Sequence, residues 1–411
     1  MRISPSIRIP GLLAGLGVTA ATLVAVTPPA AADVVPCVGL TPTIVATADG
    51  ERLQGTDGPD VISIVGFDRV QVDAGGGDDV VCSTAWTSAV VRGGPGADML
   101  VDRTGPKEGI EDATQLYGGP GADQLRGALY GRTIAAFTGA PAGVTIRLDD
   151  RKAVDEGDTD SLEGIRSVIG SPYRDTFVGS DGNDRYTSSD DYLVETDGDV
   201  IRTGAGDDRV WAFSSSVDLG PGHDEAAGTG SRIVGGTGND RIRVETSGTA
   251  LGGPGRDELS GGADMDSAGP GPSRISLLGG AGNDRLFLPS AYADSPSAGC
   301  PRYCTRSRVD GEQGSDTLAL VWRRSVIDLG AGRARAQGGR ASLGSVENVV
   351  GSRYADVVRG SARANLLVGR RGDDVLLGRG GADTLVGDRG QDRADGGQGR
   401  DRCVAEVRTS C

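Results

Sequence analysis

One short pattern, Gly-Gly-x-Gly-x-Asp, recurs along this chain and constrains its fold more than any other feature. Its six copies begin at Gly93, Gly118, Gly235, Gly252, Gly279 and Gly396. A chain of this composition would contain about 0.2 copies by chance. In five of the copies the residue two positions after the aspartate is Leu or Ile, and in the sixth it is Cys403. A turn that recurs with one aliphatic residue behind it indicates a repeat architecture rather than an ordinary globular domain.

Looser copies lie between these six, and near the carboxyl terminus they become regular. From Gly351 to Gly396 a glycine recurs every nine residues, and so does the acidic position from Asp356 to Asp401, with Asn365 in one place. Glycine permits positive φ and close approach between turns, aspartate supplies a hard oxygen ligand, and the aliphatic residue can point inward from a short strand. The pattern therefore predicts short strands that stack into a parallel β-solenoid.

The composition supports loops that hold cations. The chain contains 69 Gly, and its 57 acidic residues divide into 45 Asp and only 12 Glu. Aspartate is a turn residue and a short oxygen ligand, so this excess fits cation-binding turns. Collagen is excluded because the glycines do not recur every third residue. The net charge of −15 argues against a nucleic-acid partner, since such proteins normally present a basic face.

The pattern resembles the RTX, or hemolysin-type, calcium-binding repeat over most of residues 50–403. The resemblance implies an all-β parallel β-roll or β-helix solenoid, with Ca²⁺ held in the turns by aspartates and backbone carbonyls. Asparagine keeps an oxygen but lacks the charge, so the resemblance implies a weaker site at Asn365. Asp60, Asp175 and Asp224 belong to weaker copies and are less certain ligands. The implied ligands are Asp79, Asp98, Asp123, Asp184, Asp208, Asp240, Asp257, Asp284, Asp316, Asp356, Asp374, Asp383, Asp392 and Asp401.

The spacing of the motifs predicts how the solenoid is divided. Uninterrupted nonapeptides occupy only residues 351–403, and motifs elsewhere lie 15–25 residues apart, which predicts longer coils there. A second repeat relates Ile146-Arg147-Leu148 to Ile327-Asp328-Leu329 with an ungapped offset of 181 residues. We therefore predict two similar arrays, residues 33–230 and 231–411, with a soft boundary between them.

The amino terminus predicts export. Two arginines precede an apolar run from Gly11 to Val26, and Ala30-Ala31-Ala32 offers a cleavage site, so residues 1–32 are predicted to be a cleaved signal peptide. No other apolar stretch approaches the length of a membrane helix. We expect a secreted, extracellular chain without a membrane span.

The six cysteines of an exported chain predict disulfides. Proximity favours Cys300–Cys304 and Cys403–Cys411, which leaves Cys37–Cys82, although six cysteines allow 15 pairings.

No catalytic constellation is recognisable in the sequence. His223 is the only histidine, and its place in the variable position of a degenerate repeat predicts a solvent-facing loop residue. Arginine often follows the motif aspartate, as at Arg209 and Arg241, and we expect a solvated face that offsets neighbouring acids rather than a ladder for anionic polymers. The acidic segment from Asp155 to Asp160 is read as a loop, with a cation site as the alternative.

The sequence therefore predicts a secreted Ca²⁺-binding solenoid with a structural or surface-interaction role, and no enzymatic activity. Its expected partners are calcium ions and an extracellular or cell-surface polysaccharide. The alternative is an extracellular polysaccharide lyase on a calcium-binding β-helix, with Ca²⁺ neutralising a uronate and arginine as the base.

Overall fold

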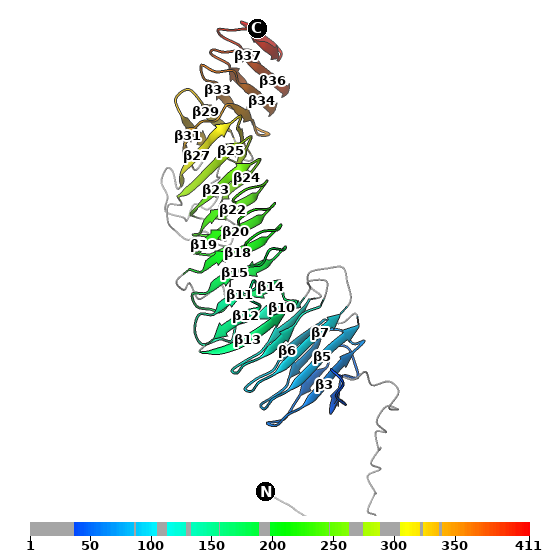
Figure 1. Cartoon of the computed structure of the whole chain (residues 1–411). Coiled ribbons are helices and arrows are strands. Elements are labelled where there is room, and N and C mark those ends of the chain that lie inside the picture. Colours follow the sequence, from blue (N-terminus) through cyan, green and yellow to red (C-terminus); the bar gives the residue numbers. More distant parts are fainter. Residues whose placement is uncertain are drawn as a thin grey trace, which may run out of the picture. The chain divides into compact units, whose positions relative to one another are not determined.

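The chain winds into a solenoid of short strands (Figure 1). The computed structural model describes residues 37–85, 88–104, 113–128, 133–155, 157–188, 198–245, 247–262, 274–287, 305–320, 324–336 and 339–411. Within these ranges the regular elements are all strands, and nearly every pairing between them is parallel. The all-β parallel solenoid predicted from the repeats is confirmed.

The strands form two sheets, which we call sheet 1 and sheet 2, and the chain passes from one to the other in turn. Sheet 1 contains β1 (Ile44–Val45), β3 (Val61–Val65), β5 (Val80–Ala85), β7 (Met99–Thr104), β9 (Gln124–Arg126), β11 (Thr145–Arg147), β12 (Lys152–Asp155), β13 (Asp158–Glu163), β15 (Thr176–Val178), β17 (Val200–Arg202), β19 (Ser216–Asp218), β21 (Arg232–Val234), β23 (Gly248–Gly255), β25 (Ile275–Gly282), β27 (Thr305–Gly314), β29 (Ser325–Asp328), β30 (Arg333–Ala336), β31 (Gly339–Gly344), β33 (Val357–Arg359), β35 (Val375–Leu377), β37 (Arg393–Asp395) and β39 (Val407–Thr409).

Sheet 2 is built from the strands that alternate with these. It contains β2 (Arg52–Gln54), β4 (Val70–Asp73), β6 (Ala89–Arg92), β8 (Thr114–Tyr117), β10 (Thr133–Ala136), β14 (Ser167–Ile169), β16 (Arg185–Thr187), β18 (Arg209–Phe213), β20 (Glu225–Thr229), β22 (Arg241–Glu245), β24 (Glu258–Gly262), β26 (Arg285–Phe287), β28 (Thr317–Ala319), β32 (Asn348–Val350), β34 (Leu366–Arg371), β36 (Thr384–Arg389) and β38 (Arg402–Val404).

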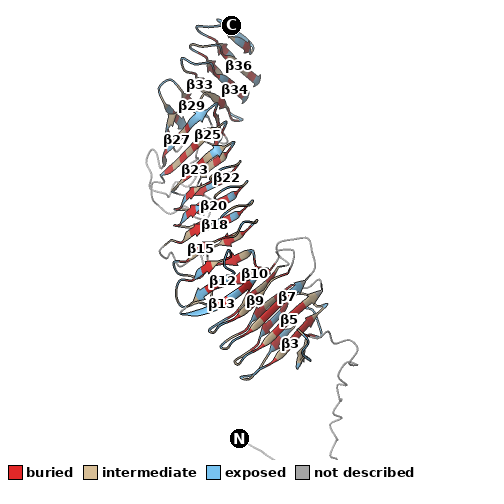
Figure 2. Ribbon diagram, viewed as in Figure 1, coloured by how far each residue is buried: buried red, intermediate tan, exposed pale blue. Residues whose placement is uncertain are grey.

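One continuous apolar core lies between the two sheets, as the red interior positions in Figure 2 show. Most strands are three to six residues long, and their central residue points inward. The residues two positions after the motif aspartates, such as Leu100, Ile242 and Leu286, have no exposed surface. Each is aligned with its equivalent on the next strand of its sheet; Leu259, for example, pairs with Ile242 and Leu286. The inward direction predicted for this position is confirmed.

The length of a coil varies along the solenoid. Between β33, β35 and β37 the register advances 18 residues per coil, which is two nonapeptides. Between β7 and β9 it advances 25 residues, because Leu100 is aligned with Leu125. Regular nonapeptides therefore give the short coils of a β-roll, and wider motif spacing gives longer coils, as predicted.

The 181-residue repeat corresponds to a local interruption of the parallel winding. The strands β11, β12 and β13 form an antiparallel meander in sheet 1, between β9 and β15. The strands β29, β30 and β31 form the same meander between β27 and β33. The acidic segment before Asp160 is thus a hairpin, in which Asp155 pairs with Asp158, and not a free loop.

Two of the predicted disulfides are present: Cys37–Cys82 and Cys403–Cys411. The pair Cys300–Cys304 and the signal peptide at residues 1–32 lie outside the described residues. Sheet 1 continues through β19, β21 and β23 across the soft boundary at residues 230 and 231, so the division into two arrays stays a prediction from the sequence. Among the residues that were searched, no helix has the length and apolarity needed to cross a membrane.

Candidate metal centre

The motif aspartates lie in the turns that lead into the strands, and hydrogen bonds join them into rows along the solenoid. In each case the backbone N–H of one aspartate donates to Oδ1 of the aspartate one coil further on. The bond from Asp79 to Asp98 measures 2.9 Å, and the bond from Asp240 to Asp257 measures 2.8 Å. Each carboxylate is therefore fixed by the coil before it.

Four such rows can be followed. The first row leads into sheet 1 and contains Asp60, Asp79, Asp98, Asp123 and Asp160. The second row leads into sheet 2 and contains Asp184, Asp208, Asp224, Asp240, Asp257, Asp284 and Asp316, with Glu347 after them. The third row, again before sheet 1, contains Asp356, Asp374 and Asp392 and ends at Glu406. The fourth row, before sheet 2, contains Asn365, Asp383 and Asp401.

Inside the rows, the second carboxylate oxygen has no hydrogen-bond partner although it is buried. In the described part of the chain this holds for Oδ2 of thirteen aspartates: Asp79, Asp98, Asp123, Asp208, Asp224, Asp240, Asp257, Asp284, Asp316, Asp374, Asp383, Asp392 and Asp401. A buried polar group without a partner is costly, and a buried charge without one costs more. The same defect on consecutive coils indicates that something other than the protein binds these oxygens.

The first glycine of each motif keeps a space open beside this oxygen. A Cβ on Gly252 would lie 2.2 Å from Asp257 Oδ2 and 2.4 Å from the carbonyl oxygen of Gly279 on the next coil. A Cβ on Gly235 would lie 2.3 Å from Asp240 Oδ2 and 2.6 Å from the carbonyl oxygen of Gly252. Any side chain here would fill a cradle lined by a carboxylate and a carbonyl, which are the oxygen ligands that Ca²⁺ prefers.

The pKa shifts agree with an uncompensated charge. Burial, helped by carboxylates on neighbouring coils, raises the pKa of Asp123 and Asp257 to about 7. The same causes raise the pKa of Asp98 and Asp374 to about 6. At neutral pH these groups would be strained anions without a cation nearby.

The donors fit a hard cation that takes most of its ligands from the backbone. Among the described residues, no three His, Cys, Asp or Glu side chains cluster as a metal site. One carboxylate per turn would therefore have to be completed by carbonyls from adjacent turns. Only oxygen ligands are available, which excludes the sulfur and imidazole sites typical of zinc and favours Ca²⁺.

Comparison with known protein families agrees with this geometry. The profile of the RTX calcium-binding nonapeptide repeat (4 copies) matches residues 167–192, 195–215, 227–244, 276–288, 350–385 and 377–406. The chain is an RTX-repeat protein. No curated protein matches it as a whole.

The RTX aspartates predicted from the sequence all lie in the four rows. The less certain Asp60 and Asp224 also lie in them, while Asp175 pairs with Asp199 in a short separate row. Sequence reasoning missed Asp199 as a row member and read Asp160 only as part of an acidic loop. Neither follows a glycine pair, but each stands directly before a strand with an aliphatic centre, Ile201 or Leu162. That local signal would have found both.

Asn365 differs from the weakened ligand that the RTX pattern implies. Its Oδ1 accepts from the backbone N–H of Ser361 at 2.7 Å, and its Nδ2 donates to the carbonyl oxygen of Glu347 at 2.7 Å. Both ends of the amide are used inside the protein. The asparagine is therefore matched to its position, because a carboxylate could not donate to that carbonyl.

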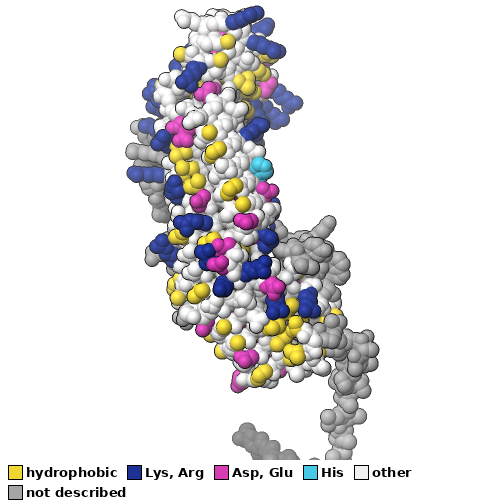
Figure 3. Space-filling model, viewed as in Figure 1, with side chains coloured by type: hydrophobic (Ala, Val, Ile, Leu, Met, Phe, Trp, Pro, Cys, Tyr) yellow, Lys and Arg dark blue, Asp and Glu magenta, His cyan; other side chains and the backbone are white. Residues whose placement is uncertain are grey.

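The remaining polar residues fit a solvated surface, and acidic and basic side chains are mixed on the face shown in Figure 3. Arg209 pairs with Glu225 at 3.2 Å and Arg241 with Glu258 at 3.5 Å, so these two arginines are offset by acids on the next strand. His223 is exposed, as predicted, and its Nδ1 accepts from the backbone N–H of Asn239 at 2.9 Å.

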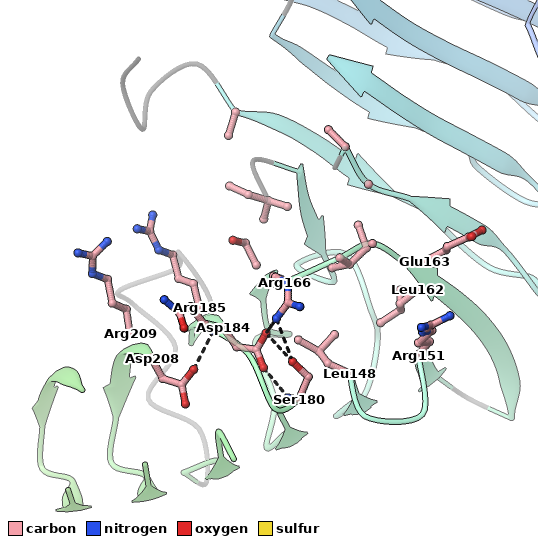
Figure 4. Close-up of a pocket in the computed structure, with 18 of the residues that line it drawn as sticks. Leu148, Arg151, Leu162, Glu163, Arg166, Ser180, Asp184, Arg185, Asp208 and Arg209 are labelled. Carbon is pink, nitrogen blue, oxygen red and sulfur yellow. Dashed lines mark hydrogen bonds and ion pairs between the residues drawn. The ribbon is translucent and has the colours of Figure 1, made fainter. Parts of the chain in front are cut away.

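A cleft of about 1490 Å³ lies beside the first meander (Figure 4). It is lined by arginines and acids together, and several of these are already paired, as Arg166 is with Asp184 and Arg126 with Glu163. This balance of charge gives the cleft no clear preference for an anion or a cation.

Proposed function

We propose that this protein is a secreted, non-catalytic Ca²⁺-binding solenoid whose coils are held together by calcium in the turns. One observation carries the proposal. Thirteen buried carboxylate oxygens lack partners, and they stand in four rows, beside glycines that leave room for a ligand. Calcium would bring positive charge to these oxygens and would be completed by carbonyls of adjacent coils.

The physical role follows from the charge of the rows. Each row brings carboxylates of consecutive coils together, with a fixed hydrogen bond between neighbours. Without cations this arrangement opposes folding, and with cations it joins each coil to the next. Calcium would then act as a structural ligand whose binding free energy contributes directly to folding.

The proposal of secretion rests on the predicted signal peptide at residues 1–32 and on the disulfides Cys37–Cys82 and Cys403–Cys411, which are typical of oxidising compartments. Extracellular calcium-binding modules often bind at about 10⁻⁴–10⁻³ M, so such a chain would order only after export. A surface role against polysaccharide is part of the same proposal.

A calcium titration tests the central claim. The chain from residue 33 to residue 411 contains the whole compact unit Pro36–Cys411. In metal-stripped buffer we expect its β circular-dichroism signal to be reduced and to return at millimolar Ca²⁺, but not at equal Mg²⁺, which demands a smaller octahedral shell. Equilibrium dialysis should show several Ca²⁺ bound per chain. An unchanged spectrum together with no bound Ca²⁺ would refute the proposal.

A further inference from the structure

Five turns of the solenoid depart from the others in one position. Where the common turn begins Gly-Gly, these begin Gly-Ser or Gly-Thr and keep the acid or amide four residues later. They are Thr56 with Asp60, Ser171 with Asp175, Ser180 with Asp184, Ser352 with Asp356, and Ser361 with Asn365. Four of them stand at the start of the four rows, and the fifth starts the short pair Asp175 and Asp199. The position is therefore systematic.

In these turns the hydroxyl residue satisfies the carboxylate that elsewhere lacks a partner. The backbone N–H of Thr56 donates to Asp60 Oδ2 at 2.7 Å, and its hydroxyl donates to the same oxygen at 2.9 Å. Ser352 makes the same two bonds to Asp356 Oδ2, at 2.7 and 2.9 Å. None of the four capped aspartates has a buried oxygen without a partner.

The backbone amide at this position is turned differently in the common motif. The N–H of Gly94 donates to the carbonyl oxygen of Gly118 on the next coil, and that of Gly236 donates to Gly252 in the same way. Both glycines have φ near +104°, which L side chains rarely adopt. The hydroxyl residues do not have positive φ, so their N–H turns inward to the carboxylate instead.

The direction of each hydroxyl is also fixed. The hydroxyl oxygen accepts from the backbone N–H two residues later, at 3.2 Å in Thr56 and at 3.1 Å in Ser171, Ser352 and Ser361. Its single proton then remains for the acid. This is a side-chain turn of the kind that serine and threonine commonly form.

A protein cation also stands at the start of the second row. Arg166 Nη1 lies 3.6 Å from Asp184 Oδ1 and donates to Ser180 Oγ at 3.2 Å. A Cβ on Gly182 would lie 2.1 Å from the same nitrogen, so the guanidinium packs directly over this turn (Figure 4).

We infer that these hydroxyl turns are metal-free caps, and that Ca²⁺ binds only at the Gly-Gly turns inside the rows. This rests on the proposed function and deepens it, because it removes Asp184 and Asp356 from the ligands implied by the repeat pattern. It also removes Asp60 and Asp175. The caps close the first coil of each row, where no earlier coil of the same row supplies carbonyls.

Two matched triple variants test the inference. The capped set is Asp60→Asn, Asp184→Asn and Asp356→Asn, and the internal set, taken from the same three rows, is Asp79→Asn, Asp240→Asn and Asp374→Asn. Bound Ca²⁺ per chain is measured by equilibrium dialysis and atomic absorption on residues 33–411. We expect the internal set to lose about three ions and the capped set to lose none. Equal losses in the two sets would overturn the inference.

A second set keeps the test decisive if the capped set does not fold. Thr56→Ala, Ser180→Ala and Ser352→Ala remove the hydroxyls alone, and Thr56→Ser, Ser180→Thr and Ser352→Thr retain them. We expect the alanine set to lower the urea midpoint at saturating Ca²⁺ without changing the number of bound ions, and the swapped set to restore the midpoint. A fall in bound Ca²⁺, or an unchanged midpoint, contradicts the inference. If the unmodified chain binds no Ca²⁺, the proposed function fails, while the midpoints still report on the hydroxyls.

Discussion

The substitution Gly252→Ala tests whether the space beside the carboxylate is a ligand site. Gly252 does not have positive φ, so alanine can adopt its backbone conformation. The new Cβ would nevertheless lie 2.2 Å from Asp257 Oδ2 and 2.4 Å from the carbonyl oxygen of Gly279. Both oxygens would have to move, and one of them is the oxygen that we assign to calcium.

The size of the effect can be estimated from two opposing terms. Overpacking of a closed site costs about 1–3 kcal/mol, and alanine recovers about 0.4–1 kcal/mol by restricting the unfolded chain. The net loss of up to about 2.5 kcal/mol corresponds to as much as about a 70-fold weaker site. We expect a higher Ca²⁺ midpoint in the circular-dichroism titration, with about one ion fewer bound at saturation.

The matched control is Gly139→Ala. Gly139 also lacks positive φ, and no atom lies within 4 Å of its added Cβ. This variant should titrate like the unmodified chain or be slightly more stable. If Gly252→Ala and Gly139→Ala have the same midpoint and bind the same number of ions, the space beside Asp257 is not a calcium site.

Three further predictions concern pH, the Asn365 turn and the carboxyl-terminal staple. Without metal, the raised pKa of Asp123, about 7 when folded against 3.8 ordinarily, means that the folded chain binds the proton more tightly; its stabilising contribution is complete below pH 3.8 and lost as pH rises through about 7, so urea midpoints in metal-stripped buffer should fall from pH 4.5 to 7.5, and a rise would contradict the buried-carboxylate argument. Asn365→Asp should destabilise the chain by about 1–3 kcal/mol, because a carboxylate would face the Glu347 carbonyl in place of a donated bond; a lower Ca²⁺ midpoint in this variant would instead restore the weakened-ligand interpretation. Cys411→Ser opens the bond to Cys403, which should cost about 2–3 kcal/mol of chain entropy and increase amide hydrogen exchange in β39; unchanged exchange there would show that the last strand does not depend on the disulfide.

Much of the fold is readable from the sequence because one residue position carries both signals. An aspartate directly before a strand ends in the turn, and the aliphatic residue two positions later points into the core, as Asp240 and Ile242 show. Nine-residue spacing places successive acids before opposite sheets, as with Asp175 and Asp184. Spacings of 16 or more keep them before the same sheet, so the rows themselves follow from motif spacing.

The meanders and the caps could not be predicted in the same way. The middle strand of each meander, Lys152–Asp155 or Arg333–Ala336, is short and mostly polar, so no apolar pattern marks it as a strand. The 181-residue offset shows that the two segments are alike without showing their shape. The caps involve a single change from Gly to Ser or Thr, and its meaning depends on which carboxylate oxygen the previous coil has already used.

The positions of caps and rows together suggest how calcium dependence is distributed along the solenoid. Before β16 the carboxylate row leads into sheet 1, and from Asp208 to Asp316 it leads into sheet 2, so most coils carry one charged turn. From Asp356 onward both turns of a coil carry an acid, with one acid or amide every nine residues. Repulsion per coil without metal is therefore greatest in this regular segment. Because each coil of a solenoid contacts only its neighbours, the caps at Ser352 and Ser361 give this segment ends that need no ion, and its folding can respond to calcium separately from the coils before it.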